Sequence, residues 1–275
     1  ERWWKDPESK IIHFIGEDNS IFHALTWPAI LMAEGNYQLP AAVVANAFLN
    51  IKFPGKEETK ISKSRGTAIW VEEYLKRFEP DPLRYYLTAI APESQRTAFD
   101  VDEFIRRNND ELANAFGNMV NRTLTFTHKY HDGFVPDPGR REAIDRAQIQ
   151  ACREAADRTA ELLDGFKFKA ALDAAMGLAR AANVYFDAKQ PWNQRKTDMV
   201  GCGVTMNVCI QTIKTLTTIL APFLPFTAAK CLDQLRMNAS VLAWDQATVE
   251  LSAGHKLGAP AVLFPKLDAG ELFED

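Results

Sequence analysis

The segment KISKSRGT, residues 60–67, gathers three cations and three hydroxyl side chains within eight residues. A lysine ammonium is a mobile point charge, and Ser and Thr hydroxyls donate hydrogen bonds to phosphate oxygens. Backbone amides around Gly66 would add donors if a helix opens near Ala68. The segment therefore fits a site for a nucleotide triphosphate, and a solvated lysine-rich turn is the alternative. The candidate residues are Lys60, Ser62, Lys63 and Ser64.

A second group of candidates lies earlier in the chain. His23 and Trp27 are four residues apart, so they project from the same face of a helix. An imidazole beside an indole suits the wall of a small-molecule pocket, and a packed aromatic pair in a half-buried helix is the alternative. Asp18 follows the glycine at position 16 and is placed either to accept hydrogen bonds from ribose hydroxyls or to cap the helix.

The elements that position these residues form a strand, helix and strand in that order. Residues 10–15 and 41–51 read as strands, and residues 21–33 between them read as a helix in which Pro28 predicts a kink or an early end. Such a unit usually pairs its strands in parallel, and ligands then lie at the carboxyl ends of the strands. Gly16 is at such an end.

Beyond residue 102 the pattern becomes helical. Leu112, Phe116, Val120 and Leu124 form one apolar stripe on a helix that is predicted to end near Tyr130. Further helices are predicted at residues 146–163, 169–189, 205–220 and 226–235. Antiparallel helices with short connections make a bundle.

Three polar residues on the first long helix are offset from its apolar stripe. Asn114, Asn118 and Arg122 are four residues apart and are predicted to lie on the opposite, exposed face. An exposed Asn and Arg one turn apart can read base edges, and a solvated helix face is the alternative.

Composition limits the class of protein. The formal charge of −4 argues against a general nucleic-acid coat, so a polyanion site must be local. No apolar run approaches the roughly 20 residues of a bilayer-crossing helix, and no secretory signal is visible, so we expect a soluble, cytoplasmic protein without membrane partners. The four cysteines form no CxxC pair and are expected to be buried free thiols.

Several motifs together resemble one family. KISKSRG resembles the KMSKS signature of class I aminoacyl-tRNA synthetases, with Ile61 in place of Met. HFIGEDNSIFHALTWPAIL at 13–31 and FDVDEFIRRNNDELANAFGNMVNR at 99–122 look like stretches of methionyl-tRNA synthetases, as do AKQPW at 188–192 and AGHKLGAPAVLFPKL at 253–267. On these separated matches the chain is identified as a member of that family.

The resemblance implies a catalytic role for the first candidates. Lys60, Ser62, Lys63 and Ser64 would belong to a mobile loop that closes over ATP, with Lys63 as the main contact. Gly16 and Asp18 would lie at the adenosine, and His23 and Trp27 would enclose methionine. ATP and Mg²⁺ are the expected cofactors, and no metal ligands are expected within this chain.

The resemblance also implies that the helical part binds tRNA(Met) through its CAU anticodon. Asn118 and Arg122 match the family's contact residues, and Trp192 would be the aromatic residue on which an unstacked base lies. The implied fold is α+β and mostly helical. It comprises the second half of a Rossmann-like catalytic domain (residues 1–101), an all-α anticodon-binding bundle (102–249) and a tail that packs back (250–275).

The sequence departs from the family pattern in three respects. The HIGH-type motif is absent, and so is the connective region that can hold zinc; both are expected upstream of Glu1. Asn46 stands where many members have a histidine, which puts one nucleotide contact in doubt. We therefore expect the C-terminal half of a methionine-tRNA ligase, inactive by itself. The alternatives are another class I synthetase and a non-catalytic tRNA-binding module.

Overall fold

The computed structural model describes residues 2–62, 64 and 66–268, and the chain divides into two compact units. The first unit comprises Glu1–Ile69 and Ile90–Asp100, and the second comprises Trp70–Ala89 and Val101–Asp275. Residues 70–89 therefore group with the helical part of the chain. The domain boundary that we placed after residue 101 stays a prediction.

The first unit begins with the predicted parallel strand, helix and strand. Strand β1 (Ile11–Gly16) pairs in parallel with β2 (Pro40–Asn46). A 3-10 turn, a π-helical segment (Phe22–Thr26) and helix α1 (Trp27–Glu34) connect them. The π segment ends just before Pro28, which has no N–H to donate and whose ring would crowd the preceding turn of a regular α-helix. The predicted kink thus takes the form of a change in helix type.

The prediction of one strand over residues 41–51 was wrong. The chain leaves β2 after Asn46, the N–H of Ala47 donates to the carbonyl of Pro92 at 2.8 Å, and a separate strand β3 (Leu49–Lys52) follows. Strand β3 belongs to a second sheet of order β4-β3-β5. In this sheet β4 (Thr59–Lys60) is antiparallel to β3, and β5 (Thr97–Asp100) is parallel to it.

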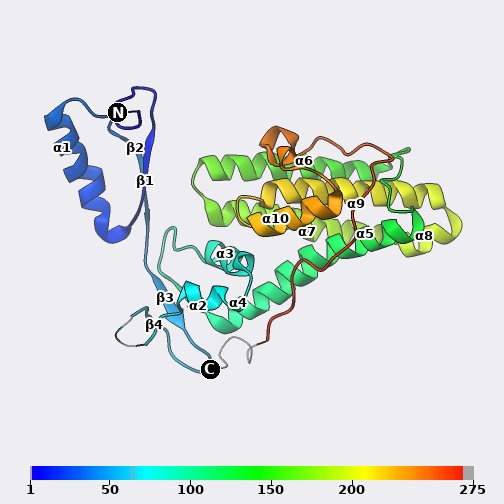
Figure 1. Cartoon of the computed structure of the whole chain (residues 1–275), viewed down its shortest axis with the longest axis horizontal. Helices are drawn as coiled ribbons and strands as arrows, with labels where there is room; N and C mark the ends of the chain where they lie inside the picture. Colours follow the sequence, from blue (N-terminus) through cyan, green and yellow to red (C-terminus); the bar gives the residue numbers. More distant parts are fainter. Residues whose placement is uncertain (1, 63, 65, 269–275) are drawn as a thin grey trace. The chain divides into compact units, whose positions relative to one another are not determined.

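The second unit is organised around one long helical segment (Figure 1). Helix α4 (Val101–Arg107) continues through a π-helical segment (Asn108–Gly117) into α5 (Asn118–Tyr130). The predicted apolar stripe is confirmed, because all four of its residues are buried, and the helix ends at Tyr130 as predicted. The stripe consists of Leu112, Phe116, Val120 and Leu124.

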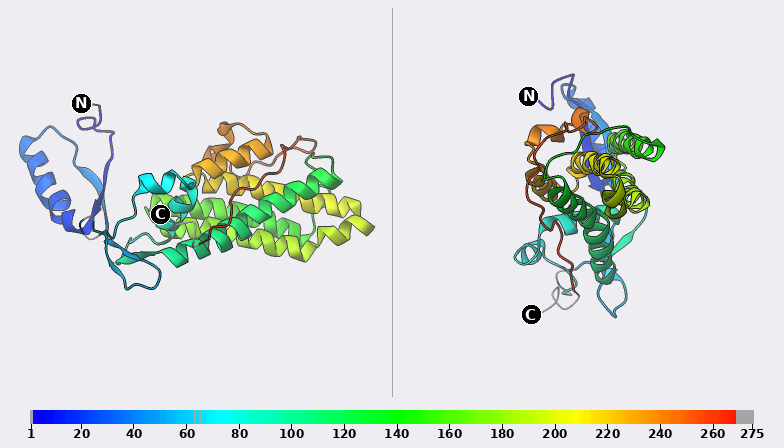
Figure 2. Two further views of the ribbon diagram at one scale, coloured as in Figure 1. Left: turned by 60° about the horizontal axis from the view of Figure 1, so that its bottom comes forward. Right: turned by 90° about the vertical axis from the view of Figure 1, so that its right-hand side faces the viewer.

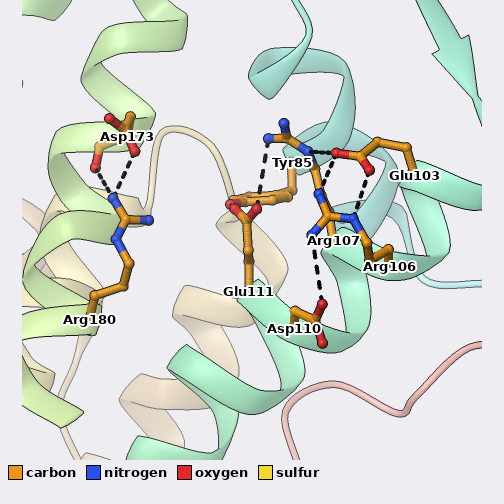
Figure 3. A network of polar contacts seen from close by, with 8 residues as sticks. All are labelled: Tyr85, Glu103, Arg106, Arg107, Asp110, Glu111, Asp173 and Arg180. Carbon is orange, nitrogen blue, oxygen red and sulfur yellow. Dashed lines mark hydrogen bonds and ion pairs between the residues drawn. The ribbon is translucent and has the colours of Figure 1, made fainter. Parts of the chain in front are cut away.

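Two short helices, α2 (Val71–Leu75) and α3 (Pro80–Ala89), belong to the same unit. Figure 3 shows the polar network that joins α3 to the start of the long helix. Glu103 pairs with both Arg106 and Arg107, and the hydroxyl of Tyr85 on α3 donates to Glu111. The hydrogen bonds from Arg106, with those from Arg107, lower the pKa of Glu103 to about 2.

The rest of the second unit is the predicted helix bundle, in which α6, α7 and α9 lie side by side (Figures 1 and 2). Helix α9 begins six residues earlier than predicted, because Asp198 caps it by accepting a hydrogen bond from the N–H of Gly201 at 2.9 Å. None of the helices in residues 2–62, 64 and 66–268 combines the length and apolarity needed to span a membrane. The helices are α6 (Ala143–Asp164), α7 (Phe168–Lys189), α8 (Pro191–Thr197), α9 (Met199–Leu220) and α10 (Pro225–Leu235).

After two 3-10 turns, Ala239–Leu242 and Trp244–Gln246, the chain runs as an irregular segment along the long helix (Figure 2). His128 Nε2 lies 2.7 Å from the carbonyl oxygen of Gly258, and Leu267 exchanges two hydrogen bonds of 2.9 Å with the side chain of Asn109. Leu257, Leu263, Phe264 and Leu267 are buried. This segment therefore completes the core of the second unit.

Candidate functional site

The carboxyl end of β1 brings Gly16 and Asp18 together. Gly16 is the last residue of the strand and pairs with Asn46 at the end of β2. A Cβ atom on Gly16 would lie 2.7 Å from Oδ1 of Asp18, so the carboxylate occupies the space that the glycine leaves open. Asp18 is exposed and makes no capping hydrogen bond to the 3-10 turn. Its carboxylate is accessible to hydroxyl donors of a ligand.

A cation that the sequence did not reveal also lies at this strand end. Arg96, from the loop before β5, pairs with Glu17 at 3.1 Å, and its guanidinium lies 5.7 Å from the centroid of the Phe48 ring. Its side chain is 61% exposed, so most of the guanidinium is solvated. No local pattern links residue 96 to residue 17, and only the folded chain places them side by side.

His23 and Trp27 lie on successive turns of the helical segment that follows, and both are half-buried. Nδ1 of His23 is 3.1 Å from the carbonyl oxygen of Asn19. Since a carbonyl only accepts, Nδ1 carries the proton, which leaves Nε2 of a neutral ring as an acceptor. The ring of His13 on β1 lies 5.2 Å from His23, and Trp4 meets Trp27 edge-on at 6.0 Å. Sequence reasoning missed both aromatic partners because they come from other segments.

The loop that contains KISKS is closed by Thr67. The Thr67 hydroxyl donates to the carbonyl of Lys60 at 2.9 Å and accepts from the N–H of Ser62 at 3.1 Å. The hydroxyls of Ser62 and Ser64 are 3.2 Å apart, and Gly66 has a φ of +64°, which favours glycine. Lys60 is exposed at the end of β4. Hydrogen bonds of Thr67 thus hold the loop together, and the Ser62 and Ser64 hydroxyls lie within hydrogen-bond distance of each other.

Two expectations for this loop concern Lys63 and a helix near Ala68. Lys63, the predicted main contact of ATP, lies outside the described residues. No helix begins near Ala68. Residues 67–70 are not helical, Trp70 has the extended backbone of an N-cap residue, and α2 begins at Val71. The predicted helix-terminal amide donors around Gly66 are therefore absent from the described loop.

In the second unit, Arg122 and Trp192 both pack on Phe186. The guanidinium of Arg122 lies 4.0 Å from the centroid of the Phe186 ring, and the Trp192 ring lies 6.0 Å from it. Arg122 also pairs with Asp187 at 3.1 Å and donates to Oδ1 of Asn183 at 3.0 Å. The prediction of an exposed position was wrong for Arg122, because these contacts hold its side chain against α7 and leave it 26% exposed.

The neighbours of this cluster extend its aromatic and basic character. Asn118 is exposed one turn before Arg122, as predicted, and Trp192 is 40% exposed. Arg195, one turn after Trp192 on α8, has its guanidinium 4.7 Å from the centroid of the Tyr130 ring. The surface here combines the cations Arg122 and Arg195 with the partly exposed rings of Tyr130 and Trp192, and the buried Phe186 ring packs against Arg122 and Trp192.

The AKQPW motif has a structural explanation in the anchoring of Lys189. The side chain of this last residue of α7 is 8% exposed, and its ammonium contacts Glu142 at 2.8 Å and Asp145 at 3.1 Å. Burial opposes its charge, but the hydrogen bonds to both carboxylates outweigh this and raise the pKa of the ammonium. Gln190 then adopts a left-handed conformation (φ +47°), and Pro191 starts α8. This fixed corner places Trp192 beside Phe186.

Two family models match the chain over nearly its whole length. A model described as tRNA synthetases class I (M) matches residues 1–124, and a model described as the anticodon binding domain of methionyl tRNA ligase matches residues 135–274. The second match alone covers half of the chain and includes α6 to α10 and the tail.

Curated relatives and solved structures agree with these matches. A methionine–tRNA ligase of Phocaeicola vulgatus is 43% identical over 98% of this chain, and one of Pyrococcus abyssi is 41% identical over 97%. The chain spans 39% and 37% of the lengths of these relatives. The solved structure of Mycobacterium tuberculosis methionyl-tRNA synthetase bound by methionyl-adenylate matches this chain with a TM-score of 0.87 at 29% sequence identity. The match covers 94% of this chain and 50% of the Mycobacterium tuberculosis chain.

Proposed function

The chain belongs to the methionyl-tRNA ligase family, and from this we propose that it serves the ATP-dependent attachment of methionine to tRNA(Met). It would supply the KISKS loop, part of the nucleotide and methionine sites, and the anticodon-binding bundle. The proposed division is residues 1–101 for the catalytic part, 102–249 for the anticodon part and 250–275 for the tail. The observation that carries the proposal most directly is the packing of Arg122 and Trp192 on Phe186.

In the proposed first step, a methionine carboxylate oxygen attacks the α-phosphorus of ATP. The new O–P bond forms as the bond from the α-phosphorus to the pyrophosphate oxygen breaks. The role of the protein is to position the reactants and to stabilise the charge that develops on the leaving group. Mg²⁺ would accompany ATP and neutralise part of this charge. We assign Lys60, Ser62, Lys63 and Ser64 to contacts with the phosphates.

We assign Gly16 and Asp18 to the adenosine, because the Asp18 carboxylate is exposed at the carboxyl end of a parallel strand. His23 and Trp27 are assigned to methionine. A half-buried indole provides a favourable surface for a thioether, since sulfur to aromatic contacts add modest attraction to apolar burial. The relative from Mycobacterium tuberculosis is described as bound by methionyl-adenylate, which supports this pairing of sites.

In the second step, a hydroxyl of the terminal ribose of tRNA(Met) would attack the methionyl carbonyl of the adenylate, and the new ester bond would form as the bond to the phosphate breaks and AMP leaves. The bundle would read the anticodon of this tRNA. Single-stranded bases are typically recognised by stacking on aromatic side chains and by hydrogen bonds to their edges. Trp192 would supply the stacking surface, and Asn118 and Arg122 the hydrogen bonds. The ion pair with Asp187 and the bond to Asn183 restrain the Arg122 guanidinium, so little conformational entropy is lost on binding.

We also propose a cytoplasmic location. The four cysteines are free and buried, an arrangement typical of proteins that fold in a reducing compartment.

The anticodon assignment is tested by the binding of a CAU stem-loop to this chain and to its Trp192→Ala variant. Loss of one stacked base costs about 1 to 3 kcal/mol, so the variant should bind about 5- to 150-fold more weakly. Trp70→Ala, which removes another exposed tryptophan of the same unit, is the matched control and should bind like the unaltered chain. Equal binding by the unaltered chain and Trp192→Ala would remove Trp192 from the site.

The chain by itself should not activate methionine, because it lacks a HIGH-type motif. Methionine-dependent exchange of pyrophosphate into ATP measures this directly. We expect no exchange above background for the purified chain, and a methionine-dependent signal would contradict the proposal that the remaining active-site residues lie outside these 275 residues.

A further inference from the structure

The second unit contains a cavity of about 100 Å³ that none of the proposed ATP, methionine or anticodon residues lines. It lies between α2, α3, the start of the π-helical segment, α10 and the final irregular segment. The cavity has room for several water molecules or for a small organic group. Its apolar walls include Tyr74, Phe78, Phe264 and Leu267.

A buried carboxylate, Asp81, also lines this cavity and is 2% exposed. Its Oδ2 accepts a hydrogen bond of 2.6 Å from the N–H of Thr227 in the first turn of α10, whereas its Oδ1 has no hydrogen-bond partner within the described ranges. Two cations, Arg77 and Lys230, also line the cavity, and Lys230 pairs with the exposed Glu79 at 3.2 Å. Asp81 itself makes no ion pair within residues 2–62, 64 and 66–268. A buried anion thus keeps one acceptor atom unused.

Asn108 supplies a second unused acceptor and is also 2% exposed. Its Nδ2 donates to Oδ1 of Asn109 and to the carbonyl of Pro265, both at 3.1 Å. Both partners are acceptors here, because Asn109 Oδ1 also receives the N–H of Leu267 at 2.9 Å. This fixes the orientation of the Asn108 amide, so the atom without a partner in the described chain is its Oδ1.

Asp81 and Asn108 both line this cavity, and each keeps one buried acceptor without a partner among the described residues, so a ligand that only donates would suit both. Leaving such atoms unsatisfied costs about 1 to 3 kcal/mol each, and more for a charged group. An alkylammonium has three N–H donors, no acceptor and a positive charge, and its stem suits apolar walls. An aromatic face beside it adds cation–π attraction.

We propose that this cavity binds a small primary amine in its ammonium form. The ammonium donates to Oδ1 of Asp81 and to Oδ1 of Asn108, and the alkyl stem packs between the aromatic walls. Ordered water is the competing occupant, because it also donates two hydrogen bonds.

The first test uses the whole 275-residue chain with leucine methyl groups labelled, so that Leu263 and Leu267 report on the cavity by NMR. Three probes are titrated at pH 7: n-butylammonium, tetramethylammonium, which has the same charge but no N–H, and uncharged butan-1-ol. We expect saturable shifts of these methyl signals with n-butylammonium and at least tenfold weaker binding of both others. No saturable binding, or equal binding of all three probes, would mean that water alone satisfies the two acceptors.

The second test is the Asp81→Asn variant, which removes the charge and retains an oxygen that accepts from the N–H of Thr227. It should bind n-butylammonium at least tenfold more weakly. Glu79→Gln at the rim is the matched control and should change the affinity less than twofold, because Glu79 is solvated. Unchanged affinity in Asp81→Asn would overturn the proposal. If circular dichroism shows that this variant is misfolded, the three-probe comparison on the unaltered chain decides the question.

Discussion

The anchoring of Lys189 makes a quantitative prediction for the Lys189→Met variant. The ammonium contacts Asp145, whose side chain is fully buried, and the exposed Glu142. Removal of one partner from a buried ion pair typically costs about 3 to 5 kcal/mol, because the other charge stays buried without compensation. Asp145 keeps two donors, the Tyr185 hydroxyl at 2.7 Å and the N–H of Glu142 at 2.8 Å. We therefore expect the lower end of this range, about 3 kcal/mol.

The assay is urea unfolding followed by circular dichroism at pH 7, where the midpoint should fall and the slope should stay constant. A loss of about 3 kcal/mol corresponds to a fall in Tm of roughly 6 to 12 °C for a unit of this size. Lys266→Met, which changes an exposed lysine, is the matched control and should shift stability by less than about 0.5 kcal/mol.

The double variant Lys189→Met with Asp145→Asn separates a lost charge pair from lost packing. With the buried carboxylate gone, much of the stability should return, since removal of both partners is far less costly than removal of one. The reasoning would be refuted if Lys189→Met cost less than about 1 kcal/mol, or if the double variant were less stable than the single one.

Three further predictions follow from buried groups. Burial lowers the pKa of Lys214 to about 8, so above that pH the folded chain binds fewer protons than the unfolded chain. The stability of the unaltered chain relative to a Lys214→Met variant should therefore rise as the pH increases from 8 towards 10. Urea unfolding at pH 7 should find Lys214→Met more stable by roughly 1 to 3 kcal/mol, and a less stable variant would show that Nζ is satisfied in solution. A Cβ on Gly258 would lie 2.4 Å from the carbonyl oxygen of Asp233, so Gly258→Ala should lower the thermal midpoint, and an unchanged midpoint would contradict this packing. All four cysteines are buried, so a thiol reagent should modify none in the native chain and all four in denaturant, and fast native labelling would be inconsistent with this burial.

Patterns of local sequence predicted those features that depend on helical periodicity. The four-residue spacing of Leu112 and Phe116 predicted the buried face of the long helix, and Pro191 predicted the end of α7. The free, buried state of the cysteines also followed from their apolar surroundings. In each case the signal lies within one element, where side-chain spacing alone decides burial.

Features that depend on distant contacts did not follow from the sequence. The break between β2 and β3 depends on a hydrogen bond from Ala47 to Pro92, and the restraint of Arg122 depends on residues of α7 more than 60 positions away. The sequence did not reveal the early start of α9, because Gly201 and Gly203 have low helix propensity. The sequence also did not reveal aromatic partners such as His13, because only tertiary packing brings their separate segments together.

The most direct test of the account is base specificity in anticodon binding. The measurement is equilibrium binding of this chain to a stem-loop with CAU and to its single-base variants, at one fixed salt concentration. Salt must be fixed because phosphate contacts alone give affinity that falls steeply as salt rises. The account predicts that each base change weakens binding by about 1 to 3 kcal/mol, roughly 5- to 150-fold. Equal affinity for all stem-loops would contradict it and would leave a nonspecific RNA-binding module.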